Sequence, residues 1–394
     1  MVKSGKKIHV ISERTAELPR TIFSRFIGMR DKNIISLGPG EPDFSTPANV
    51  NAAAKRAIDK GYTGYTRSEG LIELREAISR KIKRENNLRL DDPEKNIHVT
   101  TGSTEGILMS VLAAIDPTED VLVPNPGFLA YTPTIELVDV QATSYMLNDE
   151  SGFQIDVDKL KKLITPKTLG IIVNTPSNPT GTVLSRKVLE EIADMAIEND
   201  LTIISDEAYE AFAFGKSKHI SIGSFNGLEN HVISLYSVSK TYAMPGWRIG
   251  YVVAPEKVIE SMNKMHTYTT LCAPSISQFA AIEALTGPQQ IVKKMSNEYD
   301  RRRKFILKRI KEINGLEVKV EPEGAFYVFP RFDIGKKMTS EQFSLWLLDK
   351  AKVVTIPGTE FGSGGQGFIR LSYATNMKKI EIAMDRIEKL LGSS

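Results

Sequence analysis

The sequence predicts an α/β protein in which a larger domain with a mostly parallel sheet is joined to a smaller α+β domain. At 394 residues, with 41% hydrophobic side chains, the chain is long enough to build two buried cores. Short runs rich in Val and Ile alternate with helical patterns, which is typical of parallel strands joined by crossover helices. From about Lys294 the pattern changes to a charged helix followed by shorter elements. We therefore expect the larger domain over residues 45–293 and the smaller one over residues 294–394.

The strands expected in the larger domain are apolar runs separated by polar or helical stretches. Residues 185–199, for example, carry apolar side chains at the spacing of one helical face, which predicts a helix between two strands. The expected strands cover residues 98–99, 121–123, 170–174, 201–206, 231–236 and 251–254.

The smaller domain is expected to begin with a charged helix over residues 297–313. Strands are predicted over residues 316–320 and 324–330, and a second helix over residues 340–351. Residues 34–44 have the pattern of a strand that enters a Gly/Pro turn. We expect this N-terminal segment, residues 1–44, to complete the smaller domain.

Charge and cysteine usage exclude several classes of partner. A net charge of +3 spread over 25% charged residues gives no basic block, so neither nucleic acid nor an anionic membrane is expected as a partner. The single cysteine, Cys272, excludes an intramolecular disulfide and suits a reducing cytoplasm, although a chain poor in cysteine is also compatible with export. The basic N-terminus is not followed by an apolar run of the kind that signal peptides have, and no stretch is apolar for long enough to cross a bilayer. We expect a cytoplasmic protein.

Two glycine-containing motifs are poor matches to nucleotide sites. Residues 214–217 have the Gly-Lys-Ser tail of a P-loop, but Glu210 stands where the first glycine is required. Residues 362–367 have the glycine spacing of a dinucleotide fingerprint, yet they precede the strand expected at 368–373 and do not open a helix, so a flexible surface turn is expected there. The five histidines show no ligand spacing, and we expect no metal site.

Lys240 is the first candidate for chemistry. Small hydroxyl residues precede it, among them Ser237 and Ser239, and Arg248 follows eight positions later. A lysine in such a setting could form a Schiff base with an aldehyde cofactor whose phosphate its neighbours hold. A single lysine is more often a solvated surface charge, so this interpretation depends on the rest of the chain.

Three further features each allow a functional and a structural interpretation. Residues 101–104 follow a predicted strand and open an apolar helical stretch, so they could bind an anion at a helix N-terminus or form an ordinary helix cap. Asp206 ends an apolar strand, where it could meet a cation or cap the next turn. Arg370 lies in a strand expected to be buried, where either a ligand anion or a structural salt bridge could compensate its charge.

Five segments in this order resemble the class I/II aminotransferases, a family of pyridoxal 5'-phosphate enzymes of fold type I. They are residues 100–106, 178–181, 206–209 and 240–248, and Arg370, and the resemblance extends from about residue 34 to residue 373. It implies a mostly parallel seven-stranded sheet flanked by helices, pyridoxal 5'-phosphate as the cofactor, and amino acids and 2-oxo acids as substrates.

The resemblance also implies roles for the residues that contact the cofactor. Lys240 would carry the cofactor as a Schiff base and move the proton of the substrate Cα, and Asp206 would pair with the pyridinium nitrogen. Without the resemblance, Asn178 could be a turn residue, and Tyr209 and Phe128 could be core aromatics. In the family pattern Ser103, Thr104, Ser237 and Arg248 hold the phosphate, Asn178 and Tyr209 bond the ring's phenolic oxygen, and Phe128 stacks on the ring.

The substrate and the second subunit are implied in the same way. Arg370 would bind the substrate α-carboxylate with help from the backbone of Gly40 and from Asn178. Tyr65 matches a tyrosine that reaches the phosphate in the neighbouring subunit, which implies a homodimer with shared sites, although Tyr62 is an alternative match. No Lys or Arg occurs between residues 101 and 125, so no reader of a second substrate carboxylate is evident there.

The sequence leaves the amino donor open. The match to archaeal-type aspartate and aromatic aminotransferases favours an aromatic amino acid or aspartate as donor and 2-oxoglutarate as acceptor. Arg20 or Arg25 could approach the site and read a second carboxylate. An alanine-type aminotransferase and a lyase on the same fold are the alternatives, and a regulatory protein that uses this fold is a third.

Overall fold

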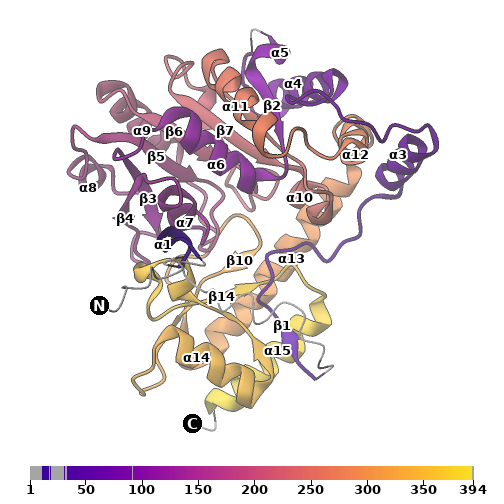
Figure 1. The fold of residues 1–394 in the computed structure, drawn as a ribbon. Coiled ribbons are helices and arrows are strands. Elements are labelled where there is room, and N and C mark those ends of the chain that lie inside the picture. The colour runs from indigo at the N-terminus through magenta and orange to yellow at the C-terminus, as the bar shows by residue number, and fades with distance from the viewer. Residues whose placement is uncertain (1–10, 17, 19–30, 32, 91, 393–394) are drawn as a thin grey trace, which may run out of the picture.

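The computed structural model describes residues 11–16, 18, 31, 33–90 and 92–392, and its main feature is a seven-stranded sheet (Figure 1). The strand order is β2-β8-β7-β6-β5-β3-β4, and β8 alone runs antiparallel to its neighbours in this sheet. The strands are β2 (Ile97–Thr100), β3 (Asp120–Asn125), β4 (Gln141–Met146), β5 (Thr168–Asn174), β6 (Thr202–Asp206), β7 (Val232–Ser237) and β8 (Gly250–Val253).

Helices cover both faces of this sheet because successive strand residues point to opposite sides. Ile204 of β6 packs into a core with α6, α7 and α11, whereas its neighbour Ile203 packs on the other face against α8 and α9. A third core joins α3, α4 and α12 to β2, β7 and β8. The helices of this domain are α3 (Ala48–Asp59), α4 (Ile72–Glu85), α5 (Pro93–Asn96), α6 (Ser103–Ala114), α7 (Tyr131–Glu136), α8 (Val157–Lys161), α9 (Arg186–Glu198), α10 (Val238–Thr241), α11 (Glu256–Thr269) and α12 (Ser275–Thr286).

The remaining elements form the smaller domain (Figure 1). They pack around a fourth core, to which Tyr209, Phe212 and Phe214 of the larger domain also contribute. Ile35 and Leu37 from the N-terminal segment belong to this core, and β1 pairs in parallel with β12. The boundaries at residues 44 and 293 stay predictions; α13 runs across the second of them. The elements are β1 (Ile35–Ser36), α13 (Gln290–Glu312), β9 (Leu316–Glu317), β10 (Tyr327–Val328), β11 (Arg331–Phe332), α14 (Ser340–Trp346), β12 (Val353–Val354), β13 (Ile356–Pro357), β14 (Ile369–Ser372) and α15 (Met377–Gly392).

Several predicted elements differ from the observed ones in length or character. The edge strand β4 is absent from the predicted strands because its polar and mostly solvent-accessible residues lack an apolar run. Residues 316–320 and 324–330 contain strands of only two residues each, and the helix expected over 340–351 ends in a π-helical turn from Leu347 to Ala351. A turn is found at 362–367 as expected, and its flexibility stays a prediction. The side chain of Asn125 holds it by accepting from Gly364 N at 2.8 Å and donating to Ser363 Oγ at 3.0 Å.

None of the described helices combines the length and the apolar character that crossing a membrane requires. The short helix α1 (Glu13–Ala16) precedes β1 in the chain and lies outside the elements that build the four cores.

Candidate active site

A cavity of about 270 Å³ lies at the carboxyl ends of β5, β6 and β7, where the smaller domain meets the sheet. Ligands of open α/β sheets generally bind at this edge. All the predicted site residues except Tyr65 line the cavity, namely Gly40, Ser103, Thr104, Phe128, Asn178, Asp206, Tyr209, Ser237, Lys240, Arg248 and Arg370. The fold thus brings together residues that lie up to 330 positions apart in the sequence.

Lys240 projects from α10, the short helix that follows β7 directly. Its Nζ donates a hydrogen bond to the carbonyl oxygen of Gly40 at 2.6 Å. Burial lowers the pKa of the Lys240 amine to about 8; Glu41 opposes this shift, and Arg370 and Arg248 add to it. A pKa so close to neutral gives the amine an accessible unprotonated form, which a nucleophile or a general base requires.

The start of α6 and the side chain of Arg248 form an anion cradle. Gly102 caps the helix at a φ of +82°, and a Cβ there would lie 2.4 Å from Arg248 Nη2, so only glycine allows this close approach. Arg248 donates to the carbonyl oxygens of Pro245 at 2.9 Å and Thr101 at 3.4 Å. Helix N-H groups, the Ser103 hydroxyl and a guanidinium group therefore converge on one end of the cavity, an arrangement that suits a phosphate.

Asp206 ends β6, lines the cavity and is buried. Tyr131 Oη donates to its Oδ2 at 2.6 Å, and Ala208 N donates to its Oδ1 at 3.2 Å. Burial raises the pKa of Asp206, and these two hydrogen bonds oppose the shift. The bond from Ala208 N shows that the turn-capping interpretation holds in part, while the cavity leaves the carboxylate open to a cationic partner. Tyr131 is a residue that sequence reasoning missed, although it lies only three residues after Phe128.

Arg370 is a buried cation without a described acidic partner. It is 3% exposed, and its Nη1 and Nη2 donate to Asn178 Oδ1 at 2.7 Å and Gly38 O at 2.6 Å. Nε has no hydrogen-bond partner, and no carboxylate among the described residues forms an ion pair with the guanidinium. The structural salt bridge considered from the sequence is therefore wrong for the described part of the chain. A buried guanidinium in this state favours an anionic ligand.

Tyr327 of β10 is a second residue that sequence reasoning missed. Its ring lies 4.4 Å from the guanidinium carbon of Arg370, and its hydroxyl lies 2.7 Å from that of Tyr209. Tyr327 Oη would collide with a Cβ on Gly40, so a glycine keeps this side of the cavity open. The sequence marked the Gly-Ala-Phe-Tyr segment as a strand, but only the fold brings its tyrosine to Arg370.

Two predicted features lie elsewhere. Tyr65 is 85% exposed and lies outside the cavity, and the partner subunit it was predicted to contact is not part of the structure. Arg20 and Arg25 fall outside the described residues. Among the described residues that line the cavity, the cations are Lys240, Arg248 and Arg370.

The donor set fits pyridoxal 5'-phosphate. The cofactor needs an amine for its aldehyde, donors for its phosphate and a carboxylate for its ring nitrogen. Lys240, the Ser103–Arg248 cradle and Asp206 supply these groups within one cavity, and the unpartnered Nε of Arg370 is left for a further anion. Phe128, which packs edge-on against Tyr131, supplies an apolar wall.

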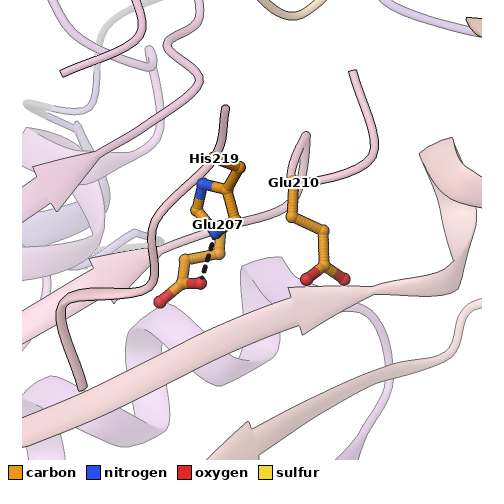
Figure 2. A group of neighbouring side chains, drawn as sticks. All are labelled: Glu207, Glu210 and His219. Carbon is orange, nitrogen blue, oxygen red and sulfur yellow. Dashed lines mark hydrogen bonds and ion pairs between the residues drawn. The ribbon is translucent and has the colours of Figure 1, made fainter. Parts of the chain in front are cut away.

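Glu207, Glu210 and His219 form a separate group of metal-ligand type, outside the residues that line the cavity (Figure 2). His219 Nε2 lies 2.7 Å from Glu207 Oε2, as the dashed line in Figure 2 shows. Glu210 already contacts the ammonium group of Lys81, a side chain that is 1% exposed, and accepts from Asn86 Nδ2 at 2.6 Å. Because Lys81 supplies the cation, we assign this group to the anchoring of the segment that carries Asp206 and Tyr209.

Comparison with known proteins places these observations in a family. A model of the aminotransferases of class I and II matches residues 32–387. The chain is 46% identical over 375 residues to an aspartate aminotransferase of Pyrococcus abyssi, covering 94% of this chain and 95% of the relative. It is 45% identical over 363 residues to aromatic-amino-acid aminotransferase 2 of Thermococcus litoralis, covering 91% and 92% of the two chains.

Solved structures give the same result for the fold. An aromatic aminotransferase from Pyrococcus horikoshii superposes with a TM-score of 0.88 at 44% identity, covering 92% of this chain and 96% of the other. An alanine aminotransferase from Pyrococcus furiosus superposes with a TM-score of 0.91 at 34% identity, covering 98% and 100%. The predicted fold class is therefore confirmed, including the seven-stranded sheet.

Proposed function

The chain belongs to the class I and II aminotransferases, which depend on pyridoxal 5'-phosphate, and we propose that it moves an amino group between an aromatic amino acid or aspartate and 2-oxoglutarate. The observation that carries this proposal is the arrangement of Lys240, Asp206 and Arg370 around one cavity. The names of the relatives, which include both aspartate and aromatic aminotransferases, support the choice of donors.

When bound, the cofactor supplies an electron-accepting ring and an aldehyde carbon. In our proposal Asp206 pairs with the ring nitrogen, Asn178 and Tyr209 bond the ring's phenolic oxygen, and Ser103, Thr104, Ser237 and Arg248 hold the phosphate. Tyr131 then stabilises the ionised carboxylate of Asp206, because its hydroxyl donates to Oδ2 at 2.6 Å.

Lys240 has two successive roles in the proposal. Its Nζ would hold the cofactor at the aldehyde carbon, and once an amino substrate takes that place, the neutral amine would accept the proton from the substrate Cα. The lowered pKa of about 8 favours the neutral amine that this second role requires. Gly40 O, 2.6 Å from Nζ, helps to fix the amine in position.

Arg370 selects substrates that carry an α-carboxylate. Two of its nitrogens are held by Asn178 and Gly38, so the fork is fixed in direction before a substrate arrives. Fixing the carboxylate orients the Cα–H bond relative to the cofactor ring, which favours loss of the proton over loss of carbon dioxide. This argument favours transamination over decarboxylation, whereas a lyase that eliminates a β-substituent also begins with loss of the Cα proton and is separated by its products.

An alanine-type activity is the second candidate, because the neighbour from Pyrococcus furiosus is an alanine aminotransferase that covers 98% of this chain. We also propose a cytoplasmic homodimer in which Tyr65 reaches the phosphate of the partner's site. The 85% exposure of Tyr65, a large aromatic side chain, is compatible with such a contact.

The test is a panel of amino donors offered with 2-oxoglutarate, with glutamate formation as the readout. We expect turnover with aromatic amino acids or aspartate, and a dominant signal from alanine would select the second candidate. Release of ammonia and pyruvate without glutamate would identify a lyase. Lys240→Ala is the matched control, and it should give no glutamate with any donor.

A further inference from the structure

Two histidines lie in contact with each other next to the anion cradle, in a place that no proposed step uses. His98 of β2 and His266 of α11 pack edge to face, with ring centroids 4.7 Å apart, and both side chains are fully buried. His266 faces Glu105, which lies in the first turn of α6 directly after Ser103 and Thr104. One residue, Glu105, therefore links the histidine pair to the side chains that we place on the phosphate.

Glu105 holds the turn that forms the cradle. Its Oε2 accepts a hydrogen bond from Thr101 N at 2.5 Å, and its Oε1 accepts from Thr270 Oγ1 at 2.9 Å. The carbonyl of Thr101 in turn accepts from Arg248 at 3.4 Å. Glu105 thus fixes the turn that precedes Ser103 and whose carbonyl oxygen binds Arg248. It also places a negative charge beside a site for an anion.

The hydrogen-bond geometry of His266 shows how that charge is compensated. Nδ1 lies 2.9 Å from the carbonyl oxygen of Ser68, which can only accept, so Nδ1 carries a proton. Nε2 is buried and has no hydrogen-bond partner, but it lies 3.5 Å from Glu105 Oε2, within ion-pair distance of an oxygen that can only accept. Both ring nitrogens face acceptors, and this favours the doubly protonated imidazolium.

The pKa shifts agree with this geometry. Burial lowers the pKa of His266, but the hydrogen bonds to Glu105 and to the Ser68 carbonyl outweigh burial and leave it raised. Burial raises the pKa of Glu105, yet the bonds from His266, Thr101 and Thr270 bring it down to about 2. Burial and the charge of His266 lower the pKa of His98 to about 4, so that ring stays neutral. His266 also lies in the last turn of α11, where the helix dipole favours a cation.

The other charges near this group are paired or distant. Glu69, in the loop before α4, interacts with His98 and is held by Arg67 at 3.3 Å. From α5, Lys95 pairs with Glu256 at the opposite end of α11, and Glu94 faces Arg75. Glu105 is therefore the carboxylate that His266 compensates, and His266 is its cationic partner.

We propose that His266 is a positioning residue for the cofactor phosphate, and that its protonated form cancels the charge of Glu105 beside the anion cradle. This inference rests on the proposed placement of the phosphate at Ser103, Thr104 and Arg248. The direction of the pH dependence of phosphate binding follows directly. The contribution of His266 is complete below its ordinary pKa of about 6.5 and is lost as the pH rises through its raised pKa, because Glu105 stays ionised throughout.

The experiment compares pyridoxal 5'-phosphate with pyridoxal, which lacks the phosphate, as ligands of the full-length chain freed of cofactor. Dissociation constants are measured by absorbance titration between pH 7 and pH 9, above the second phosphate pKa of about 6. The ratio of the two constants isolates the phosphate, because the titration of Lys240 affects both ligands alike. For the unsubstituted chain we expect this preference for the phosphate to fall roughly tenfold over the range, as one uncancelled charge at short distance predicts.

Two variants and one control identify the residue that causes the fall. His266→Gln should show the low preference at all pH values, and Glu105→Gln should show the high preference at all pH values. His98→Asn replaces the neutral partner histidine and should follow the unsubstituted chain. If His266→Gln does not fold, Glu105→Gln carries the test alone, because glutamine keeps the shape of the side chain and can still accept from Thr101 N.

A preference that does not change with pH in the unsubstituted chain would overturn the inference, as would an unchanged slope in Glu105→Gln. If pyridoxal 5'-phosphate binds no tighter than pyridoxal at any pH, the placement of the phosphate is itself wrong and the inference falls with it. The two failures are therefore distinguishable.

Discussion

Replacing Tyr131 by phenylalanine removes one hydroxyl group and tests whether the residue tunes Asp206. The hydroxyl donates to Asp206 Oδ2 at 2.6 Å, and both side chains are buried. A hydrogen bond to a charged group contributes about 1.5–3 kcal/mol, and one pKa unit corresponds to about 1.4 kcal/mol. Loss of the bond should therefore raise the pKa of Asp206 further and weaken it as the partner of a cationic ring nitrogen.

We expect kcat of Tyr131→Phe to fall about tenfold to a hundredfold, with KM for the amino donor much less affected, because Tyr131 contacts the carboxylate and not the substrate. The assay is steady-state glutamate formation with saturating cofactor. The pH dependence of kcat should also change, because an Asp206 carboxylate with a higher pKa alters the pH range over which the ring nitrogen stays protonated.

Tyr145→Phe is the matched control for this prediction. Tyr145 is equally buried, and its hydroxyl donates to the main-chain carbonyl of Ile172 at 2.8 Å, outside the residues that line the cavity. Both variants leave a buried acceptor short of one donor, which costs about 1–3 kcal/mol of folding free energy. Both should lower Tm, but only Tyr131→Phe should lower kcat strongly. Equal losses of kcat in the two variants would refute a specific role for Tyr131.

Three further predictions test other residues of the site. Lys240→Ala should abolish turnover of the cofactor-loaded enzyme, and near-normal rates from the purified variant would contradict its assignment. Arg370→Lys should raise KM for the amino donor about tenfold to a hundredfold, because a lysine cannot reproduce the planar fork held by Asn178 and Gly38; an unchanged KM would place the α-carboxylate elsewhere. Tyr65→Phe should weaken the binding of pyridoxal 5'-phosphate about twofold to tenfold, the effect of one hydrogen bond, whereas Tyr62→Phe should not, and the reverse pattern would assign the partner contact to Tyr62.

The sequence predicted the centre of the sheet well, because buried parallel strands are apolar along their whole length. The runs at 170–174 and 201–206 match β5 and β6 to within two residues at either end. The edge strand β4 could not be found in this way, since only its residue Tyr145 is buried. The predicted strands of the smaller domain were too long, because a periodic pattern does not show where pairing with a neighbouring strand ends.

The candidate site was predicted through ordered motifs, and its missing members were those that only the fold brings near. Tyr131 and Tyr327 belong to apolar stretches in which an aromatic residue is expected in the core. Their hydroxyl groups become informative only once Asp206 and Tyr209 are seen beside them. The same holds for His266, whose partners Ser68 and Glu105 are about 200 and 160 positions away in the sequence.

Buried cations show why a structure was needed to separate function from architecture. Lys81 and Arg370 are both almost fully buried, although Lys81 lies in a charged stretch of α4 and Arg370 lies between Ile369 and Leu371. Lys81 contacts the carboxylate of Glu210 and is a structural cation that anchors the chain behind Asp206. Arg370 is held by an amide oxygen and a carbonyl oxygen, with no described carboxylate, so its charge is oriented but not neutralised. Because burying an uncompensated charge is costly, such a cation is expected where a ligand supplies the missing anion. Replacing Lys81 should therefore lower the stability of the fold, whereas replacing Arg370 should weaken substrate binding.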